Sequence, residues 1–198
     1  MATTVQEQNT LKNCVVIAGS NGSGKTTFAK SYFESYPYDY LNADEIAAEM
    51  NSNEPEKVRI QAGRLFFRNL SVLIEEGKNV IIESTLSGRG FHRILKELRN
   101  AGYDISIIFI FLETPELCLA RVRERVRKGG HNVSERDVVR RFYRSIKNFW
   151  NIYREEADLW HLFYNAGEHF EVVAFGERSS YLINNEELFN LFLQEVKL

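Results

Sequence analysis

The chain has 198 residues, of which 44% are hydrophobic and 26% are charged, a composition that indicates one globular domain and excludes a disordered chain. Its net charge of −2 gives no global reason to expect a nucleic-acid partner. Residues 1–12 lack the apolar core of a signal peptide, and the apolar run at 105–112 is too short to cross a bilayer, so we expect a cytoplasmic protein that does not bind membranes.

The first predicted elements are an apolar strand at residues 14–18, a glycine-rich loop and a helix that begins at Gly24. The loop, residues 19–26, fits the GxxxxGK[ST] pattern of a P-loop. In that pattern the backbone N–H groups surround a phosphate, the lysine reaches the β- and γ-phosphates, and the threonine hydroxyl binds Mg²⁺. A turn that only capped a helix would not explain Lys25 and Thr26. The predicted nucleotide-binding residues are Gly19, Asn21, Gly22, Ser23, Gly24, Lys25, Thr26 and Thr27, with Thr26 as the metal ligand.

The second predicted strand, residues 38–41, is followed by an acidic residue, Asp44. Ligands of an open parallel sheet bind at the carboxyl ends of its strands, so Asp44 is expected across from the P-loop. A carboxylate there could accept the proton of an attacking hydroxyl group or bind the metal. The alternative is that Asn42 or Asp44 only caps the following helix, which we expect to extend to Met50.

The third predicted strand, residues 79–83, ends in a carboxylate, Glu83. Glu83 is a candidate to bind a second metal or a hydroxyl group of the substrate. Thr85 would add a hydroxyl group, and Arg89 would reach an anionic substrate group. The alternative is that Ser84, Thr85 or Ser87 caps the next helix and that Arg89 is a solvated helical residue.

The fourth predicted strand, residues 105–112, is not followed by the aspartate that ends an apolar strand in many P-loop ATPases. This absence favours a small-molecule kinase over a mechanical ATPase. Pro115 suits the first turn of the next helix, with Thr114 as its N-cap. Cys118 in that helix, like Cys14 in the first strand, is expected to be a small buried hydrophobe in a reducing compartment.

Residues 121–147 form a strongly basic segment. Arg121 and Arg125 are one helical turn apart, so Arg121 could stack on adenine and Arg125 could neutralise the phosphates. Arg140 and Arg141 could act as transition-state arginines supplied by the same chain. The alternative for any one of these residues is a solvated helix surface. The segment has ten basic residues: Arg121, Arg123, Arg125, Arg127, Lys128, Arg136, Arg140, Arg141, Arg144 and Lys147.

A Gly-Gly turn, Gly129 and Gly130, separates two helices of this segment, which predicts a mobile helical lid at about 121–147. His131 in the turn is interpreted as a loop residue rather than a base. The second helix is expected over residues 134–153, with Arg140 and Arg141 beside or opposite its apolar face. That face repeats at intervals of three and four residues and comprises Val139, Phe142, Ile146, Phe149 and Tyr153.

The alternation of strands and helices predicts an α/β fold with a mainly parallel sheet. A fifth strand at residues 170–175 and a last helix from Asn185 complete it. We therefore expect one P-loop domain over residues 1–198, with a five-stranded sheet and with disorder in residues 1–12.

Several of these segments together resemble the zeta-toxin family of P-loop kinases, in particular a compact, ATPase-like branch of it. They are the P-loop, residues 41–46 and 83–89, and the arginines with the Gly-Gly turn. The resemblance implies an adenylate-kinase-like fold, ATP with Mg²⁺ as phosphoryl donor, and an antitoxin as partner. It implies phosphate and Mg²⁺ roles for Lys25 and Thr26, and Asp44 as base. Its implied substrate residues are Glu83 and Thr85, and its implied phosphate clamps are Arg125 with Arg140 or Arg141. The family's best-known members phosphorylate a UDP-aminosugar, UDP-N-acetylglucosamine.

The leading hypothesis is thus an ATP-dependent kinase that phosphorylates a hydroxyl group of a small molecule. The catalytic residues are expected to be Lys25, Asp44, Arg125, Arg140 and Arg141. One alternative is a kinase of nucleic-acid ends or tRNA, although the net charge weighs against a nucleic acid. Another is a nucleotide-dependent binding or toxin module without transfer activity.

Overall fold

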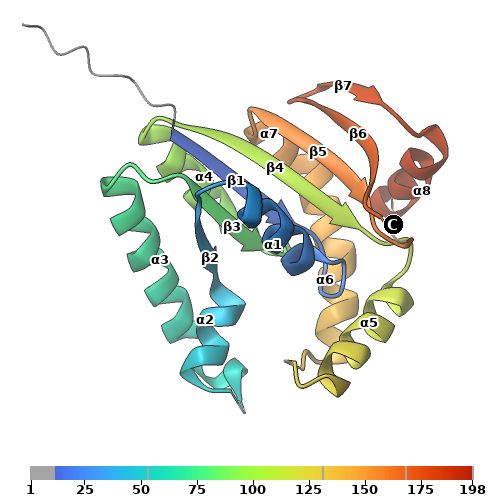
Figure 1. The fold of residues 1–198 in the computed structure, drawn as a ribbon. Coiled ribbons are helices and arrows are strands. Elements are labelled where there is room, and N and C mark those ends of the chain that lie inside the picture. Colours follow the sequence, from blue (N-terminus) through green and yellow to red (C-terminus); the bar gives the residue numbers. More distant parts are fainter. Residues whose placement is uncertain (1–11, 53, 131, 168, 198) are drawn as a thin grey trace, which may run out of the picture.

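The computed structural model describes residues 12–52, 54–130, 132–167 and 169–197. They form a seven-stranded sheet in the order β2-β3-β1-β4-β5-β6-β7 (Figure 1). The strands β2, β3, β1, β4 and β5 run parallel, and β6 and β7 are added antiparallel at one edge. The strand bounds are β1 Lys12–Ala18, β2 Asp39–Asn42, β3 Val80–Ser84, β4 Tyr103–Phe111, β5 Leu159–Tyr164, β6 Glu171–Glu177 and β7 Ser180–Ile183.

The predicted α/β class with a mainly parallel sheet is confirmed, but the prediction of five strands is wrong. The first four predicted strands and the one at 170–175 match β1 to β4 and β6, whereas β5 and β7 were missed. β5 is rich in aromatic residues and lacks a clear period-two pattern, so periodicity does not separate it from a buried helical segment. β7 has only four residues, all exposed, and therefore carries no buried face that a sequence pattern could reveal.

From β1 to β5 helices lie between successive strands as predicted, whereas β5, β6 and β7 follow one another with no helix described between them. The described residues also include two irregular helical turns, a 3₁₀ turn at Pro55–Val58 and a π-helical turn at Phe149–Tyr153. The expected helix at 134–153 is therefore α6 followed by the π turn and the short α7. The α-helices are α1 Lys25–Ser35, α2 Ala43–Met50, α3 Arg59–Glu75, α4 Phe91–Asn100, α5 Pro115–Arg127, α6 Glu135–Asn148, α7 Arg154–Glu156 and α8 Glu186–Lys197.

The central strands are covered on both faces, which explains their continuous apolar sequences. On one face, Val15 and Ile17 of β1 pack with Ala29 of α1. On the other, Val16 packs with a larger core that includes Leu70 of α3 and residues of α4, α6 and α8. Figure 1 accordingly shows α1 alone in front of the sheet, with α4 and α6 behind it.

Both cysteines are buried and free, as predicted. Burial raises the pKa of the Cys14 thiol to about 12, and it also raises the pKa of Cys118. Neither side chain is therefore a thiolate at neutral pH. Among the described residues, no helix has the length and apolar character needed to cross a membrane.

Candidate active site

The polar residues of the site gather where β1, β3 and β2 end. Because β3 lies between β1 and β2, Glu83 is in register with Ile17 on one side and with Asn42 on the other. The P-loop follows β1 directly, and α2 follows β2 directly. Sheet topology thus brings the first, second and third strand ends together, as expected for a ligand site of an open parallel sheet.

The P-loop has a backbone that only glycine adopts readily. Gly22 has a φ of 84°, and a Cβ atom added there would lie 2.6 Å from the carbonyl oxygen of Cys118 in α5. Gly24 has a φ of 98°, and an added Cβ would collide with the side chain of Asn165. The glycines of the motif therefore allow a left-handed backbone and close packing against α5 and the end of β5.

Several polar side chains of this loop are buried. Lys25 is only 7% exposed, and its amine donates a hydrogen bond to the carbonyl oxygen of Ser20 at 2.9 Å. Desolvation lowers the pKa of Lys25, while the nearby carboxylates of Glu83 and Asp44 act in the opposite direction. The Ser23 hydroxyl is buried, and no hydrogen-bond partner occurs among the described residues. A bound phosphate would supply the acceptor and the negative charge that these groups require.

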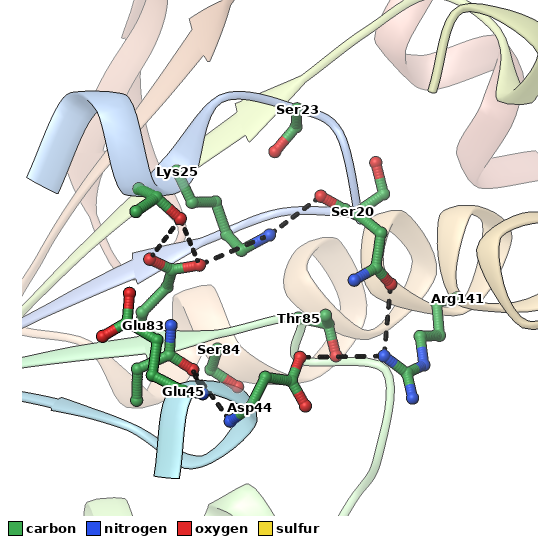
Figure 2. Close-up of polar contacts among 12 residues, drawn as sticks. Ser20, Ser23, Lys25, Asp44, Glu45, Glu83, Ser84, Thr85 and Arg141 are labelled. Atoms are coloured by element: carbon green, nitrogen blue, oxygen red, sulfur yellow. Dashed lines mark hydrogen bonds and ion pairs between the residues drawn. The ribbon is translucent and has the colours of Figure 1, made fainter. Parts of the chain in front are cut away.

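Glu83 contacts the P-loop rather than facing outward toward a substrate. Its carboxylate accepts a hydrogen bond from the Thr26 hydroxyl at 3.0 Å, and its Oε1 lies 3.9 Å from the Lys25 amine (Figure 2). The Tyr40 hydroxyl donates to Glu83 Oε2 at 2.7 Å. Burial, followed by the charge of Glu83, raises the pKa of Tyr40, so Tyr40 remains a hydrogen-bond donor at neutral pH.

Asp44 lies in the first turn of α2 but does not cap this helix. Asn42 is the N-cap, and its side-chain oxygen accepts from the backbone N–H groups of Asp44 and Glu45. The Asp44 side chain is 61% exposed, and Oδ2 lies 3.8 Å from Nη1 of Arg141 (Figure 2). Of the two caps that the sequence allows, the structure therefore selects Asn42 and leaves the Asp44 carboxylate at the mouth of the P-loop.

Arg141 is where the sequence interpretation of α6 was wrong. It was placed beside or opposite the apolar face, but it is 3% exposed and lies on the buried face with Val138 and Phe142. Its Nη1 donates to the side-chain oxygen of Asn21 in the P-loop at 3.2 Å. Its buried Nε has no hydrogen-bond partner among the described residues. Arg141 thus places a buried guanidinium beside both the P-loop and Asp44.

Arg140, its neighbour, is on the surface. Its guanidinium pairs with Asp137 one turn earlier in α6 at 2.6 Å. Arg121 is half-buried and Arg125 is exposed on α5. Arg125 is near enough to the Lys25 amine to contribute to lowering its pKa, after the larger effect of desolvation. His131, which was predicted to be a loop residue, lies outside the described residues.

The remaining predicted substrate residues lie in the segment between β3 and α4. The Thr85 and Ser87 hydroxyl groups are hydrogen-bonded to each other at 2.9 Å, and Arg89 is exposed. Asn148 of α6 donates to the carbonyl oxygen of Leu86 at 2.8 Å, which ties this segment to the helix that carries Arg141. Thr27, predicted to bind the nucleotide, is exposed in the first turn of α1.

Two residues of the site, Tyr40 and Asn165, were not singled out from the sequence. Tyr40 alternates with the buried Leu41 in β2 and so points to the same side of the sheet as Asn42, which the sequence offered only as a cap. Asn165 follows β5 and donates to the carbonyl oxygen of Ser23 at 2.8 Å. It had no sequence signal, because β5 itself was not recognised.

The donor set fits ATP with Mg²⁺. Hard oxygen ligands suit Mg²⁺, which is commonly held by few protein ligands together with phosphate oxygens and water. Thr26 and Glu83 supply oxygen atoms beside the P-loop, and no cluster of three or more metal-binding His, Cys, Asp or Glu residues occurs in the described part of the chain. This pattern suits a metal brought in with a nucleotide better than a metal bound by protein alone.

Comparisons with known proteins agree with this geometry. The structure superimposes on the AvrRxo1-ORF1:-ORF2 complex with ATP with a TM-score of 0.73 at 16% identity, covering 91% of this chain and 63% of that chain. It matches the PezAT toxin–antitoxin system of Streptococcus pneumoniae with a TM-score of 0.66 at 14% identity, covering 98% and 90%. It thus spans less than two thirds of the AvrRxo1 chain. At these identities, the similarities show a shared fold.

Sequence comparison extends to one bacterial relative. A protein of Haemophilus influenzae is 31% identical over 129 residues, which cover 65% of this chain and 91% of the relative. The model of the AAA domain family AAA_33 matches residues 14–147, a range that includes the P-loop, Asp44, Glu83 and Arg141. The chain therefore belongs to the AAA_33 family of AAA domains.

Proposed function

We propose that this protein is an ATP-dependent kinase that transfers the γ-phosphoryl group to a hydroxyl group of a small molecule. The observation that carries the proposal is the position of Arg141, whose guanidinium contacts both Asp44 and the P-loop residue Asn21. A site that only held a nucleotide would not need an exposed carboxylate and a buried arginine at the mouth of the loop.

Each residue has a role that follows from its chemistry. Lys25 and the P-loop backbone bind the phosphates, and Thr26 provides the Mg²⁺ ligand. The hydroxyl oxygen of the substrate attacks the γ-phosphorus, and Asp44 takes up the proton that this hydroxyl group loses. The bond from that phosphorus to the bridging oxygen breaks, and ADP leaves. Arg141 stabilises the charge that spreads over the transferred group.

The lid of this kinase is assigned to α5 and the turn that follows it. Phe142 and Ile146 of α6 are 0% and 1% exposed, which supports α6 as a fixed wall of the core rather than a moving part. The exposed residues 123–129, at the end of α5 and in the turn after it, could approach bound phosphates, and Arg125 remains their candidate clamp. Arg121 remains the candidate contact for adenine.

For the acceptor, we propose a nucleotide-sugar such as a UDP-aminosugar, with Thr85 and Arg89 as its contacts. Resemblance to the zeta toxins supports this choice. The alternatives are a nucleic-acid or tRNA acceptor, or nucleotide binding without transfer. We also propose a protein antitoxin as partner, because PezAT is a toxin–antitoxin system by name and AvrRxo1-ORF1:-ORF2 is a complex of two components.

The test is an ATP-consumption screen with UDP-sugars, nucleosides, antibiotics and RNA as acceptors. Asp44→Asn should lower transfer about 100-fold or more, because a general base contributes about 10²- to 10⁴-fold, and it should leave ATP affinity unchanged. Glu49→Gln, an exposed carboxylate later in α2, is the matched control and should keep full activity. Full activity of Asp44→Asn, or ATP binding without transfer to any acceptor, would refute the kinase assignment.

A further inference from the structure

The hydroxyl group of Tyr40 connects the two halves of the site. It donates to Glu83 Oε2 at 2.7 Å and accepts from the side-chain amide of Asn42 at 3.0 Å. Asn42 in turn caps α2 by accepting from the backbone N–H of Asp44 at 2.9 Å. A series of hydrogen bonds therefore leads from the helix that carries Asp44, through Asn42 and Tyr40, to Glu83.

These contacts define the direction of each hydrogen bond. A phenol has one hydrogen to donate, and the contact with the Glu83 carboxylate is the short one. The contact with Glu45 Oε1 is longer, at 3.5 Å. The Asn42 amide can only donate to the Tyr40 oxygen, because its own oxygen already accepts at the N-terminus of α2. The orientation of the Tyr40 hydroxyl is thus determined on both sides.

Glu83, which accepts the hydrogen bond of Tyr40, also contacts the P-loop. Its side chain is only 9% exposed, and it accepts from the Thr26 hydroxyl with both oxygens, at 3.0 and 3.2 Å. When the Thr26 hydrogen points at the carboxylate, the lone pairs of its oxygen point away from it. That is the orientation in which a threonine hydroxyl can bind a metal ion.

We propose that Tyr40 is a positioning residue, which holds Glu83 and thereby the Thr26 hydroxyl in the orientation that binds Mg²⁺, and which links this orientation through Asn42 to the start of α2. The inference rests on the proposed function in one respect, the binding of ATP with Mg²⁺. It does not depend on which acceptor is phosphorylated, or on whether transfer occurs.

The test separates metal binding from nucleotide binding. The affinity of the full chain for ATP is measured by calorimetry in EDTA and in saturating Mg²⁺, and the ratio of the two dissociation constants gives the gain due to the metal. For Tyr40→Phe we expect unchanged affinity in EDTA and about a ten-fold smaller gain, because loss of an outer-shell partner typically weakens metal affinity about 10- to 100-fold.

Two further variants test the series of hydrogen bonds through Asn42 and Tyr40. Asn42→Ser keeps a good N-cap for α2 but removes the amide donor to Tyr40. It should therefore reduce the gain in ATP affinity due to Mg²⁺ by less than Tyr40→Phe does. The gain of the double variant should equal that of Tyr40→Phe alone. Tyr38→Phe removes a hydroxyl group two residues earlier, from the aromatic cluster with Tyr32 and Tyr36. It is the control, and it should leave the gain unchanged.

The outcomes are distinct. Equal weakening of ATP binding by Tyr40→Phe with and without Mg²⁺ would indicate only a structural role and would overturn the inference, as would an unchanged gain. A wild-type chain whose affinity for ATP does not rise with Mg²⁺ would overturn it too. If the gain behaves as expected but no acceptor is phosphorylated, the proposed kinase activity fails and the role of Tyr40 stands.

Discussion

Arg140 and Arg141 are adjacent in the chain, yet their side chains have opposite environments. Successive residues of an α-helix point about 100° apart, so one can face the core while the other faces water. Arg140 pairs with Asp137 along the surface of α6, and Arg141 reaches Asn21 and Asp44. Of the two candidates for the transition-state arginine, the geometry therefore favours Arg141.

This assignment predicts that replacing arginine by lysine slows phosphoryl transfer at position 141 but not at position 140. Arg141→Lys keeps a positive charge but loses the planar guanidinium and its parallel donors. Once an acceptor is known, it should lower the rate of phosphoryl transfer about 10³-fold, the lower end of the contribution of an arginine finger. Arg140→Lys should leave the rate unchanged. Single-turnover transfer from radiolabelled ATP measures both, and equal losses in the two variants would disprove the assignment.

The residues of the site differ in how far the sequence could predict them. Lys25, Thr26 and the glycines belong to one local motif of fixed spacing, so the sequence alone singles them out as candidates. The structure places Lys25 and Thr26 beside Glu83. Tyr40 acts only because β2 pairs with β3 in the register that aligns Asn42 with Glu83. That register is a tertiary property, and one chain without an alignment does not reveal it.

At the scale of elements, helix starts were more predictable than strands. Thr114 was predicted as the N-cap of the helix that begins at Pro115, and its side chain does accept from the backbone N–H of Leu117 at 3.3 Å. A cap is a local hydrogen bond between residues three positions apart, so sequence suffices. β5 is different, because it is defined by its parallel pairing with β4, some 50 residues away.

The cap itself makes a measurable contribution to stability. Thr114→Ala should lower the free energy of unfolding by about 1 kcal/mol, because the Leu117 N–H loses its acceptor. For a chain of this size, that corresponds to a fall of about 2–4 °C in the melting temperature. Differential scanning calorimetry would measure it. Thr114→Ser, which retains a hydroxyl group at the cap, should restore most of the loss, and an equal loss in both variants would contradict a capping role.

At the scale of the whole molecule, two antiparallel strands extend the sheet beyond its parallel part and leave one aromatic cluster half-covered. His161 of β5 stacks on Phe163 and Phe175 at ring distances of 6.3 and 5.9 Å. Its cross-strand neighbours are Ile108 and Phe175. With apolar residues on both sides, burial lowers the pKa of His161 below its usual value.

This depressed pKa predicts the direction in which stability depends on pH. Above about pH 6.5, the pKa of an unfolded histidine, His161 is neutral in both states and stability is unaffected. As the pH falls below that value, the unfolded chain binds a proton more readily than the folded chain, so the free energy of unfolding decreases until the pH reaches the folded pKa. Urea denaturation between about pH 7.5 and 5.5 would measure this decrease.

His161→Gln isolates the contribution of this side chain. Burial raises the pKa of Glu45 and Glu195, which opposes the histidine effect, but these carboxylates are present in both proteins and cancel in the comparison. The difference in unfolding free energy between wild type and His161→Gln should therefore shift against the wild type as the pH falls through this range. A difference that is constant with pH would show that the two antiparallel strands leave His161 as accessible to protons in the folded chain as in the unfolded one.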